Sequence, residues 1–366
     1  MRAVITGGGT GGHLFPGIAL ACALQERHSG SEILFIGTPR LLDQQALRNR
    51  GFQLATLSSS GVKGLGLGAQ IRSLLSQPAA IWQARQMLRR FKPALVFGVG
   101  GYVTGPVLLA AKLMGIPTAI HEQNSVPGLA NRLAGRLVDK ICISIPCQPA
   151  FPPHKTVRTG NPVRAEIVAA SQQKSRGGQA GNIPSLLVLG GSQGAHALNE
   201  RMVAVMGILH NRGLRLQLQH QTGSADAAMV QDAYRKTGVQ AEVKPFIEDM
   251  AAAYASADLV VSRAGATSLA ELAVMGLPAI LVPYPFAADD HQASNAEYYV
   301  QGGGAVMYRE KDLTPEILAA QIQTLLEDEQ RHRMAEAMRA LGQPDAAERL
   351  VDECFVLVAG KDRAEP

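Results

Sequence analysis

Two glycine-rich segments stand where an apolar, strand-like run gives way to a helical stretch. Segment 7–12 carries glycines at the spacing G-x-G-x-x-G after the apolar run 2–6, and segment 190–194 (GGSQG) follows the apolar run 185–189. Backbone N–H groups and the helix dipole at such a position favour a phosphate group. A tight turn without a ligand is the alternative for either loop alone. Two such loops in one chain favour a site for two substrates.

The chain lacks the features of the commonest nucleotide-binding enzymes. A dinucleotide oxidoreductase normally has an acidic residue at the end of its second strand, where it holds the ribose. Here that strand ends Phe35-Ile36-Gly37-Thr38, which disfavours an NAD enzyme. The sequence has no G-x-x-x-x-G-K-[ST] element, which argues against a P-loop NTPase. It has no D-x-D pair either, so a metal ion on a diphosphate would lack its usual carboxylates.

Two further groups of polar residues suit a nucleotide sugar. His13 directly follows the first glycine loop, where an imidazole that titrates near neutral pH is unusual. Segment 262–271 (SRAGATSLAE) opens a helix after an apolar strand, which fits an anion site. In it, the Glu271 carboxylate could accept both hydroxyls of a ribose and Arg263 could neutralise a diphosphate. The alternatives are a capping contact for His13, a solvated side chain for Glu271 and a surface ion pair for Arg263.

Two polar loops complete the set. Segment 284–295 carries Asp289, Asp290, His291, Gln292 and Asn295, a density of hydrogen-bonding groups that suits a sugar, although a merely solvated loop would also show it. Segment 121–124 (HEQN) ends a predicted parallel strand, the edge at which such sheets bind ligands.

The elements that must position these residues alternate between short apolar strands and helices. This alternation predicts two Rossmann-like, doubly wound α/β domains. We place their junction in the polar, glycine-rich segment 171–184 or slightly before it. The predicted domains are 1–164 and 165–341, with a helical tail at 342–366. The remaining predicted strands are 32–36, 94–98, 118–121, 140–144, 215–220, 241–245, 259–262, 279–282 and 305–308.

Length and composition agree with a two-domain globular protein. At 366 residues the chain exceeds the size at which one core usually keeps growing. Its four cysteines show neither C-x-x-C pairing nor histidines at zinc-like spacing, so we expect reduced thiols and no metal. No secretory signal is visible, and no apolar stretch approaches the ~20 residues that a membrane-spanning helix requires.

The positive charge is concentrated near the start of the chain. Residues 1–110 carry eleven Lys or Arg and three acids, and no acidic side chain lies in 44–121. Residues 71–91 mix basic and apolar side chains, as in helices that lie on an anionic membrane surface. Core helices with solvated arginines are the alternative, and Pro78 is expected to kink or split the segment. The side chains concerned are Ile71, Arg72, Leu74, Leu75, Ile81, Trp82, Arg85, Met87, Leu88, Arg89, Arg90 and Phe91.

Six motifs follow one another in a characteristic order. They are GGTGGH (8–13), GVGGY (98–102), HEQN (121–124), GNPVR (160–164), GGSQGA (190–195) and HQ-x-x-NA (291–296). Together they resemble the family 28 glycosyltransferases that transfer N-acetylglucosamine from UDP to lipid I and so form lipid II in peptidoglycan synthesis. The resemblance extends over roughly residues 1–341.

The resemblance implies a GT-B fold, in which the two domains face each other across a cleft, and an inverting transfer. The second domain would hold UDP-N-acetylglucosamine and the first would hold lipid I. It implies no cofactor, no metal and no nucleic acid, and a peripheral position on the cytoplasmic face of the bacterial membrane. Another GT-B glycolipid transferase, such as one that glycosylates diacylglycerol, and a non-catalytic nucleotide-sugar sensor are the alternatives.

The resemblance also implies the roles of individual residues. His13 is the candidate general base, which would take the proton from the acceptor hydroxyl. Helix-start amides, together with Arg263, would stabilise the departing diphosphate in place of a metal. Ile247 would meet uracil through its backbone, and Gln292 would read the sugar hydroxyls. The predicted acceptor-binding residues are Gly100, Gly101, Tyr102, His121 and Glu122. The predicted donor-binding residues are Thr10, Gly11, Gly12, Asn124, Arg164, Ser192, Ile247, Arg263, Ala266, Thr267, Ser268, Leu269, Ala270, Glu271 and Gln292.

Overall fold

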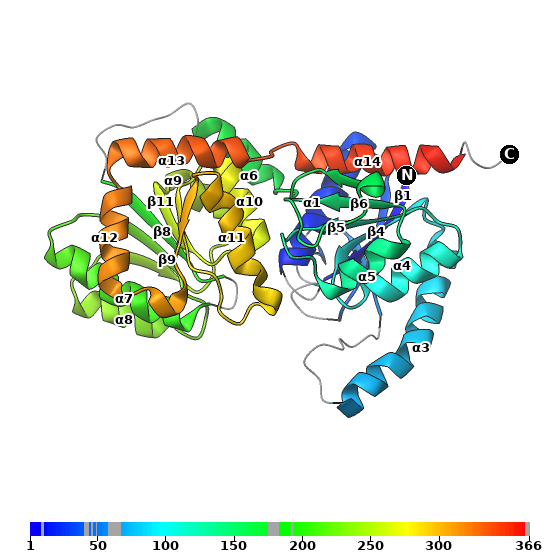
Figure 1. Cartoon of the computed structure of the whole chain (residues 1–366), viewed down its shortest axis with the longest axis horizontal. Helices are drawn as coiled ribbons and strands as arrows, with labels where there is room; N and C mark the ends of the chain where they lie inside the picture. Colours follow the sequence, from blue (N-terminus) through cyan, green and yellow to red (C-terminus); the bar gives the residue numbers. More distant parts are fainter. Residues whose placement is uncertain are drawn as a thin grey trace. The chain divides into compact units, whose positions relative to one another are not determined.

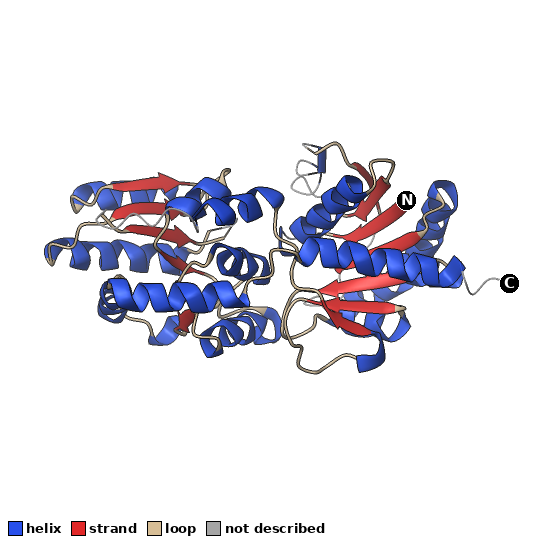
Figure 2. Ribbon diagram, turned by 90° about the horizontal axis from the view of Figure 1, so that it is seen from above, coloured by secondary structure: helices blue, strands red, loops and turns tan. Residues whose placement is uncertain are grey.

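The computed structural model describes residues 1–8, 11–39, 44, 47–48, 50–57, 67–174, 183–191 and 194–362, with the backbone alone at 11, 67–76 and 361–362. The chain forms two compact units. One consists of Met1–Val163 and Asp345–Pro366, and the other of Arg164–Pro344. Each has a single sheet between layers of helices (Figures 1 and 2). No helix in the described part of the chain has both the length and the apolar character needed to cross a membrane.

The first unit is built on a parallel sheet of seven strands in the order β3-β2-β1-β4-β5-β6-β7. The strand order reverses between β1 and β4, and in sheets of this kind ligands bind outside the carboxyl ends of the strands at such a reversal. Gly7 at the end of β1 pairs with Gly100 at the end of β4. The strands are β1 (Arg2–Gly7), β2 (Glu32–Gly37), β3 (Gln53–Thr56), β4 (Leu95–Gly100), β5 (Thr118–Glu122), β6 (Lys140–Ile143) and β7 (Thr156–Arg158).

Helices cover both faces of this sheet, which is why its central strands are continuous apolar runs. One core forms between the sheet, α1 and the last helix, α14. A second core forms on the opposite face, beneath α3, α4 and α5. The bounds are α1 (Gly11–Arg27), α3 (Leu67–Phe91), α4 (Thr104–Leu113), α5 (Leu129–Leu137) and α14 (Ala346–Asp362), with a short 3-10 turn η1 (Pro153–Lys155).

The second unit repeats the design with six parallel strands in the order β10-β9-β8-β11-β12-β13. Here the order reverses between β8 and β11. The strands are β8 (Ser185–Leu189), β9 (Gln217–Gln221), β10 (Ala241–Lys244), β11 (Leu259–Ser262), β12 (Ala279–Leu281) and β13 (Ala305–Met307). The helices are α6 (Ala165–Lys174), α7 (His196–Asn211), α8 (Ala227–Lys236), α9 (Met250–Ser256), α10 (Ala266–Met275), α11 (His291–Gln301), α12 (Pro315–Leu325) and α13 (Asp328–Leu341), with 3-10 turns η2 (Ala288–Asp290) and η3 (Glu310–Asp312).

The structure differs from the sequence-based expectation in three local respects. Helix α1 begins at Gly11, before the predicted Phe15, and therefore includes His13 in its first turn. Pro78 lies inside a single helix, α3, so of the predicted kink or split the split does not occur. The exposed position of Pro78 explains this, because water can replace the hydrogen bond that the ring removes. The edge strands β3 and β7 were not predicted, since each is short and carries polar residues.

The last segment of the chain returns to the first unit. Leu350, Val351 and Cys354 of α14 are buried in the core that α1 also lines. Two ion pairs reinforce this packing. Arg27 contacts Asp352 at 2.9 Å and Lys140 contacts Glu353 at 2.7 Å. Residues that the sequence set apart as a tail are thus an integral layer of the first unit.

Candidate functional site

Glycines at the end of β4 allow a close approach of backbone and ring at the strand reversal of the first unit. Gly100 and Gly101 both have positive φ angles, of 104° and 94°. A Cβ atom on Gly100 would lie 2.8 Å from two ring atoms of His13, and one on Gly101 would lie 2.7 Å from the carbonyl oxygen of Gly8. The His13 ring therefore lies directly on the backbone of Gly100. Glycine at this position is what leaves room for it.

His13 is partly exposed and has one side-chain partner in the described structure. Its Nδ1 lies 3.2 Å from Oε1 of Gln123, the third residue of the HEQN segment. The structure thus brings the first turn of α1 and the HEQN segment into contact through two residues that are 110 positions apart in the sequence. Gln123 itself was not among the predicted site residues.

His121 and Glu122, the first two residues of the HEQN segment, hold this segment in place from the protein interior. Both are buried, His121 completely. The Glu122 carboxylate accepts hydrogen bonds from the backbone and side chain of Asn124, at 2.9 and 3.1 Å, from the Gly128 N–H at 3.1 Å and from Asn131 at 2.8 Å. The prediction that His121 and Glu122 contact the acceptor is therefore corrected, because neither side chain reaches the surface. Of the predicted acceptor side chains, Tyr102 is exposed, at 52%.

One glutamine joins two loops at the carboxyl ends of the strands of the second unit. Gln221 donates to the carbonyl oxygen of Gly191 at 3.0 Å and accepts from the backbone N–H of Ile247 at 3.1 Å. The N–H of Ile247 is thus already used, so a contact between its backbone and uracil would have to use the carbonyl group. Gln221 was missed by the sequence analysis. Its place at the end of a parallel strand is the same signal that singled out the HEQN segment.

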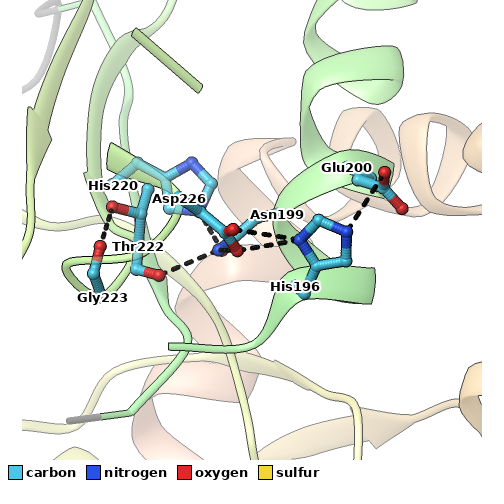
Figure 3. Close-up of polar contacts among 7 residues, drawn as sticks. All are labelled: His196, Asn199, Glu200, His220, Thr222, Gly223 and Asp226. Atoms are coloured by element: carbon cyan, nitrogen blue, oxygen red, sulfur yellow. Dashed lines mark hydrogen bonds and ion pairs between the residues drawn. The ribbon is translucent and has the colours of Figure 1, made fainter. Parts of the chain in front are cut away.

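A polar network anchors the helix that follows the second glycine loop (Figure 3). Asn199 donates to the carbonyl oxygen of Thr222 at 2.9 Å and to Asp226 at 2.7 Å, and its Oδ1 lies 3.1 Å from Nε2 of His220. At the exposed end, Nδ1 of His196 lies 3.0 Å from Asp226, and this hydrogen bond raises the pKa of His196. The network holds the loop after β9 against the start of α7.

The start of α10 brings together two predicted residues of the second unit. The helix begins at Ala266 with Gly265 as its cap and no capping side chain, so its first N–H groups lack a side-chain partner at the cap. Oε1 of Glu271 accepts from Nε and NH2 of Arg164 at 3.1 and 3.0 Å, and Oε2 accepts from the Tyr254 hydroxyl at 3.0 Å. The carboxylate is nearly buried. A carboxylate has about four acceptor positions, so at least one is left for a ribose hydroxyl.

The first turn of α10 divides into a surface part and a core part. Ala266, Thr267 and Ser268 are partly exposed, whereas Leu269 and Ala270 are buried. The prediction that Leu269 contacts the donor is corrected, because its side chain is fully enclosed in the core.

Arg263 does not offer a free charge to a diphosphate. Its NH2 contacts Glu310 at 2.5 Å, and its NH1 donates to the carbonyl oxygens of Val282 and Pro283 at 3.1 and 3.3 Å. These contacts neutralise the guanidinium and tie it to the segment after β12. A contact between Arg263 and a diphosphate stays a prediction, in which the diphosphate would share the guanidinium with these partners.

Gln292 is held by its carbonyl end. Oε1 accepts from the backbone N–H groups of Ala264 and Tyr284, at 3.2 and 2.9 Å. The amide orientation follows, since two N–H donors require the oxygen. The NH2 group of Gln292 has no partner among the described residues, so it remains a donor for a sugar hydroxyl.

The remaining predicted residues are placed as follows. Thr10 and Ser192 lie outside the described residues. Gly11 and Gly12 begin α1, with Gly12 exposed, and Asn124 is partly exposed. Within the described part of the chain no group of three or more His, Cys, Asp or Glu side chains could hold a metal ion, and the four cysteines are free.

Comparisons with known proteins agree on one family. The sequence model of the glycosyltransferase family 28 N-terminal domain matches residues 3–143, and that of the C-terminal domain matches residues 185–350. A protein of Desulfotalea psychrophila is 50% identical over 98% of this chain and 97% of its own length, and one of Anaeromyxobacter dehalogenans is 47% identical over 98% and 93%. Both are named UDP-N-acetylglucosamine--N-acetylmuramyl-(pentapeptide) pyrophosphoryl-undecaprenol N-acetylglucosamine transferase.

A solved structure gives the same result. The crystal structure of Acinetobacter baumannii MurG superimposes with a TM-score of 0.78 at 33% identity, covering 97% of this chain and 99% of that one. The similarity extends over both units and supports the two-domain GT-B fold class.

The close packing of the second glycine loop leads to a stability prediction. Gly194 has φ 79°, and a Cβ atom there would lie 2.2 Å from the carbonyl oxygen of Thr222. Gly213 has φ 77° with nothing within 4 Å of a Cβ atom. We expect Gly194→Ala to lower the free energy of unfolding by about 3 kcal/mol or more, and Gly213→Ala by about 1 kcal/mol, because only the first adds a clash to backbone strain. Urea denaturation measures both, and equal losses would contradict the close packing.

Proposed function

The chain belongs to glycosyltransferase family 28, and from this premise we infer that it transfers N-acetylglucosamine from UDP-N-acetylglucosamine to undecaprenyl-pyrophosphoryl-N-acetylmuramyl-pentapeptide. This is the reaction for which its relatives are named. The observation that carries the inference is identity of 46–50% over nearly the full length of both domains. Another glycolipid transferase is disfavoured, because the relatives at this identity share one name.

The second unit has the features that a UDP-sugar requires. The glycine loop after β8 and the start of α10 both follow strands at the reversal of strand order, where helix dipoles and backbone N–H groups favour a diphosphate. Glu271 is held in place by Arg164 and Tyr254, which orients its remaining acceptor position. The unpaired NH2 group of Gln292 is suited to a sugar hydroxyl. We assign these groups to the donor.

The first unit supplies the candidate base. Inversion requires a single in-line attack at the anomeric carbon and removal of a proton from the attacking hydroxyl. His13 is a partly exposed imidazole at the strand reversal of the first unit, in contact with Gly100. We propose that it takes this proton, and that Tyr102 and the backbone of Gly100 and Gly101 contribute to the acceptor site.

We further propose that the transfer uses neither a metal ion nor a cofactor. The charge that develops on the departing UDP would be stabilised by helix-start amides, which need no reorganisation during the reaction. The pairing of Arg263 with Glu310 reduces the charge that this guanidinium offers to the diphosphate, so we assign the larger part of the stabilisation to the helix-start amides.

A membrane surface is proposed on the helical layer α3, α4 and α5 of the first unit. Leu129, Leu133 and Leu137 recur every four residues on α5, and all three are exposed, by 46–53%. Arg132 and Arg136 on the same helix are also exposed, and α4 packs against both α3 and α5. An apolar stripe flanked by arginines suits the surface of an anionic membrane.

Trp82 on α3 is a second exposed apolar side chain of this helical layer. Its side chain is 62% exposed, and the neighbouring Arg85 and Arg89 are exposed as well. The same helix buries Ala84 and Leu88 against the sheet, so one of its faces is core and the other is solvent-exposed. We propose a peripheral position on the cytoplasmic side, where the acceptor lipid is presented.

Transfer of labelled sugar to a lipid I analogue tests the function. We expect turnover with UDP-N-acetylglucosamine and little with UDP-glucose or UDP-N-acetylgalactosamine. His13→Ala is expected to lower kcat by roughly 10²-fold or more with nearly unchanged affinity for UDP, because it removes the base and leaves the donor unit intact. A sensor without catalysis would bind UDP and show no turnover in either form.

The proposal on metals predicts that a chelator has no effect. Excess EDTA should leave the initial rate of transfer unchanged, since no step depends on a divalent ion. The control is the same assay with added magnesium. A rate that EDTA abolishes and magnesium restores would contradict the proposal.

Co-sedimentation with vesicles tests the membrane surface. We expect the chain to bind vesicles rich in anionic phospholipid more strongly than neutral ones, and Leu133→Ser/Leu137→Ser to reduce this binding several-fold by removing apolar area. Val356→Ser is the matched control, because Val356 is 63% exposed on α14, which covers the opposite face of the sheet. Equal binding to neutral and anionic vesicles would exclude the electrostatic part.

A further inference from the structure

Three polar side chains of the first unit form a continuous row of hydrogen bonds. Nδ1 of His13 lies 3.2 Å from Oε1 of Gln123, and Nε2 of Gln123 lies 3.2 Å from Nδ1 of His121. Nε2 of His121 lies 2.9 Å from the carbonyl oxygen of Gly160. The row therefore runs from the partly exposed candidate base to a backbone carbonyl in the interior.

The orientation of the central amide follows from a fourth contact. Nε2 of Gln123 also lies 3.0 Å from the carbonyl oxygen of Val99. A backbone carbonyl can only accept, so the NH2 end of Gln123 must face Val99 and its oxygen must face His13. Gln123 is buried, with 1% exposure, and has no space to exchange these partners with water.

The inner histidine agrees with this orientation. Nε2 of His121 must carry a proton to donate to the Gly160 carbonyl, which leaves Nδ1 as the acceptor for the NH2 group of Gln123. Burial lowers the pKa of His121 to about 4. Its Nδ1 therefore keeps a lone pair at neutral and alkaline pH. The donor and acceptor roles along the row stay the same over that pH range.

The orientation determines which nitrogen of His13 is basic. Oε1 of Gln123 can only accept, so Nδ1 of a neutral His13 must carry the proton and Nε2 must carry the lone pair. A free histidine side chain prefers the opposite tautomer, with the proton on Nε2. Since the His13 ring also lies on Gly100, the contact selects one tautomer and one ring orientation.

We propose that Gln123 is a positioning residue of the transfer reaction, which holds His13 in the tautomer whose Nε2 is unprotonated and able to accept the proton of the acceptor hydroxyl. The role of His13 as base rests on the proposed function. The selection of the tautomer does not, because it follows from the hydrogen bonds of the resting protein.

Two substitutions of Gln123 separate this role from a general structural one. Gln123→Met and Gln123→Glu both remove the NH2 donor, so both leave Val99 and His121 without it. Only Gln123→Glu keeps an oxygen that accepts from Nδ1 of His13. A difference between the two variants therefore reports the oxygen beside Nδ1 of His13, together with the charge that a carboxylate adds there.

The first measurement is the nitrogen chemical shift of His13 in the full-length protein labelled with [15N]histidine, without substrate, at pH 8. The resonances are assigned by their loss in His13→Ala. We expect an unprotonated Nε2 in the parent protein and in Gln123→Glu, and averaged or reversed shifts in Gln123→Met. An Nδ1–H tautomer that persists in Gln123→Met would overturn the proposal, whatever the activity.

The second measurement is the steady-state rate of transfer at pH 8. We expect Gln123→Met to lower kcat by roughly 10- to 100-fold with little change in KM for the UDP-sugar, and Gln123→Glu to recover most of the loss. Equal losses in both variants would overturn the proposal. If the parent protein transfers no sugar while its tautomer is as expected, the proposed function fails and the tautomer selection stands.

Asn199→Leu provides a control for the loss of a buried amide. Asn199 is fully buried in the second unit and makes three hydrogen bonds there. We expect this variant to lose stability and to leave the His13 shifts unchanged. A change in those shifts would mean that they respond to general destabilisation, and would remove the support they give to the proposal.

Discussion

Both units depend on the close approach of backbone segments at the carboxyl ends of two neighbouring parallel strands. In the first unit, Gly100 and Gly101 have backbone angles that other residues rarely adopt. Gly100 lies against the His13 ring, and Gly101 lies against the carbonyl oxygen of Gly8. In the second, Gly194 lies against the carbonyl of Thr222. Side chains at these positions would hold the loops and the sheet apart. The glycines thus permit helix starts and a titratable ring to lie directly on the strand ends.

Polar groups at both strand reversals are arranged so that few formal charges are free. Glu271 is paired with Arg164, and Arg263 is paired with Glu310. Glu122 is satisfied by N–H and amide donors, and His121 is kept neutral by burial, which lowers its pKa to about 4. In the proposed site a ligand would meet oriented dipoles, among them helix-start amides, the NH2 of Gln292 and Nε2 of His13. Fixed dipoles of this kind suit a diphosphate and sugar hydroxyls, because they do not need to reorganise when charge moves.

The two buried glutamines at strand ends have related tasks. Gln123 joins the end of β4 to the start of α1, and Gln221 joins the second glycine loop to the segment after β10. Each uses both ends of its amide, so each fixes two elements relative to each other. The return of the chain through α14 completes the first unit on one face of its sheet. The opposite layer, α3 to α5, keeps exposed leucine and tryptophan side chains.

The sequence by itself determined the fold class, because continuous apolar runs separated by amphipathic helices have few other solutions than doubly wound parallel sheets. It also located both glycine loops and most strands, and its ordered motifs indicated the family. It did not reveal β3 and β7, whose short, mixed patterns are stable only as edges of a sheet, or the return of α14 to the first unit. Nor did it reveal which polar residues face a ligand. Arg263, Glu122 and Gln123 have similar signatures in the sequence. Only the tertiary structure shows that Arg263 pairs with Glu310, that Glu122 accepts from Gly128 and Asn131, and that Gln123 lies against His13, because partners from distant parts of the chain meet only in the fold.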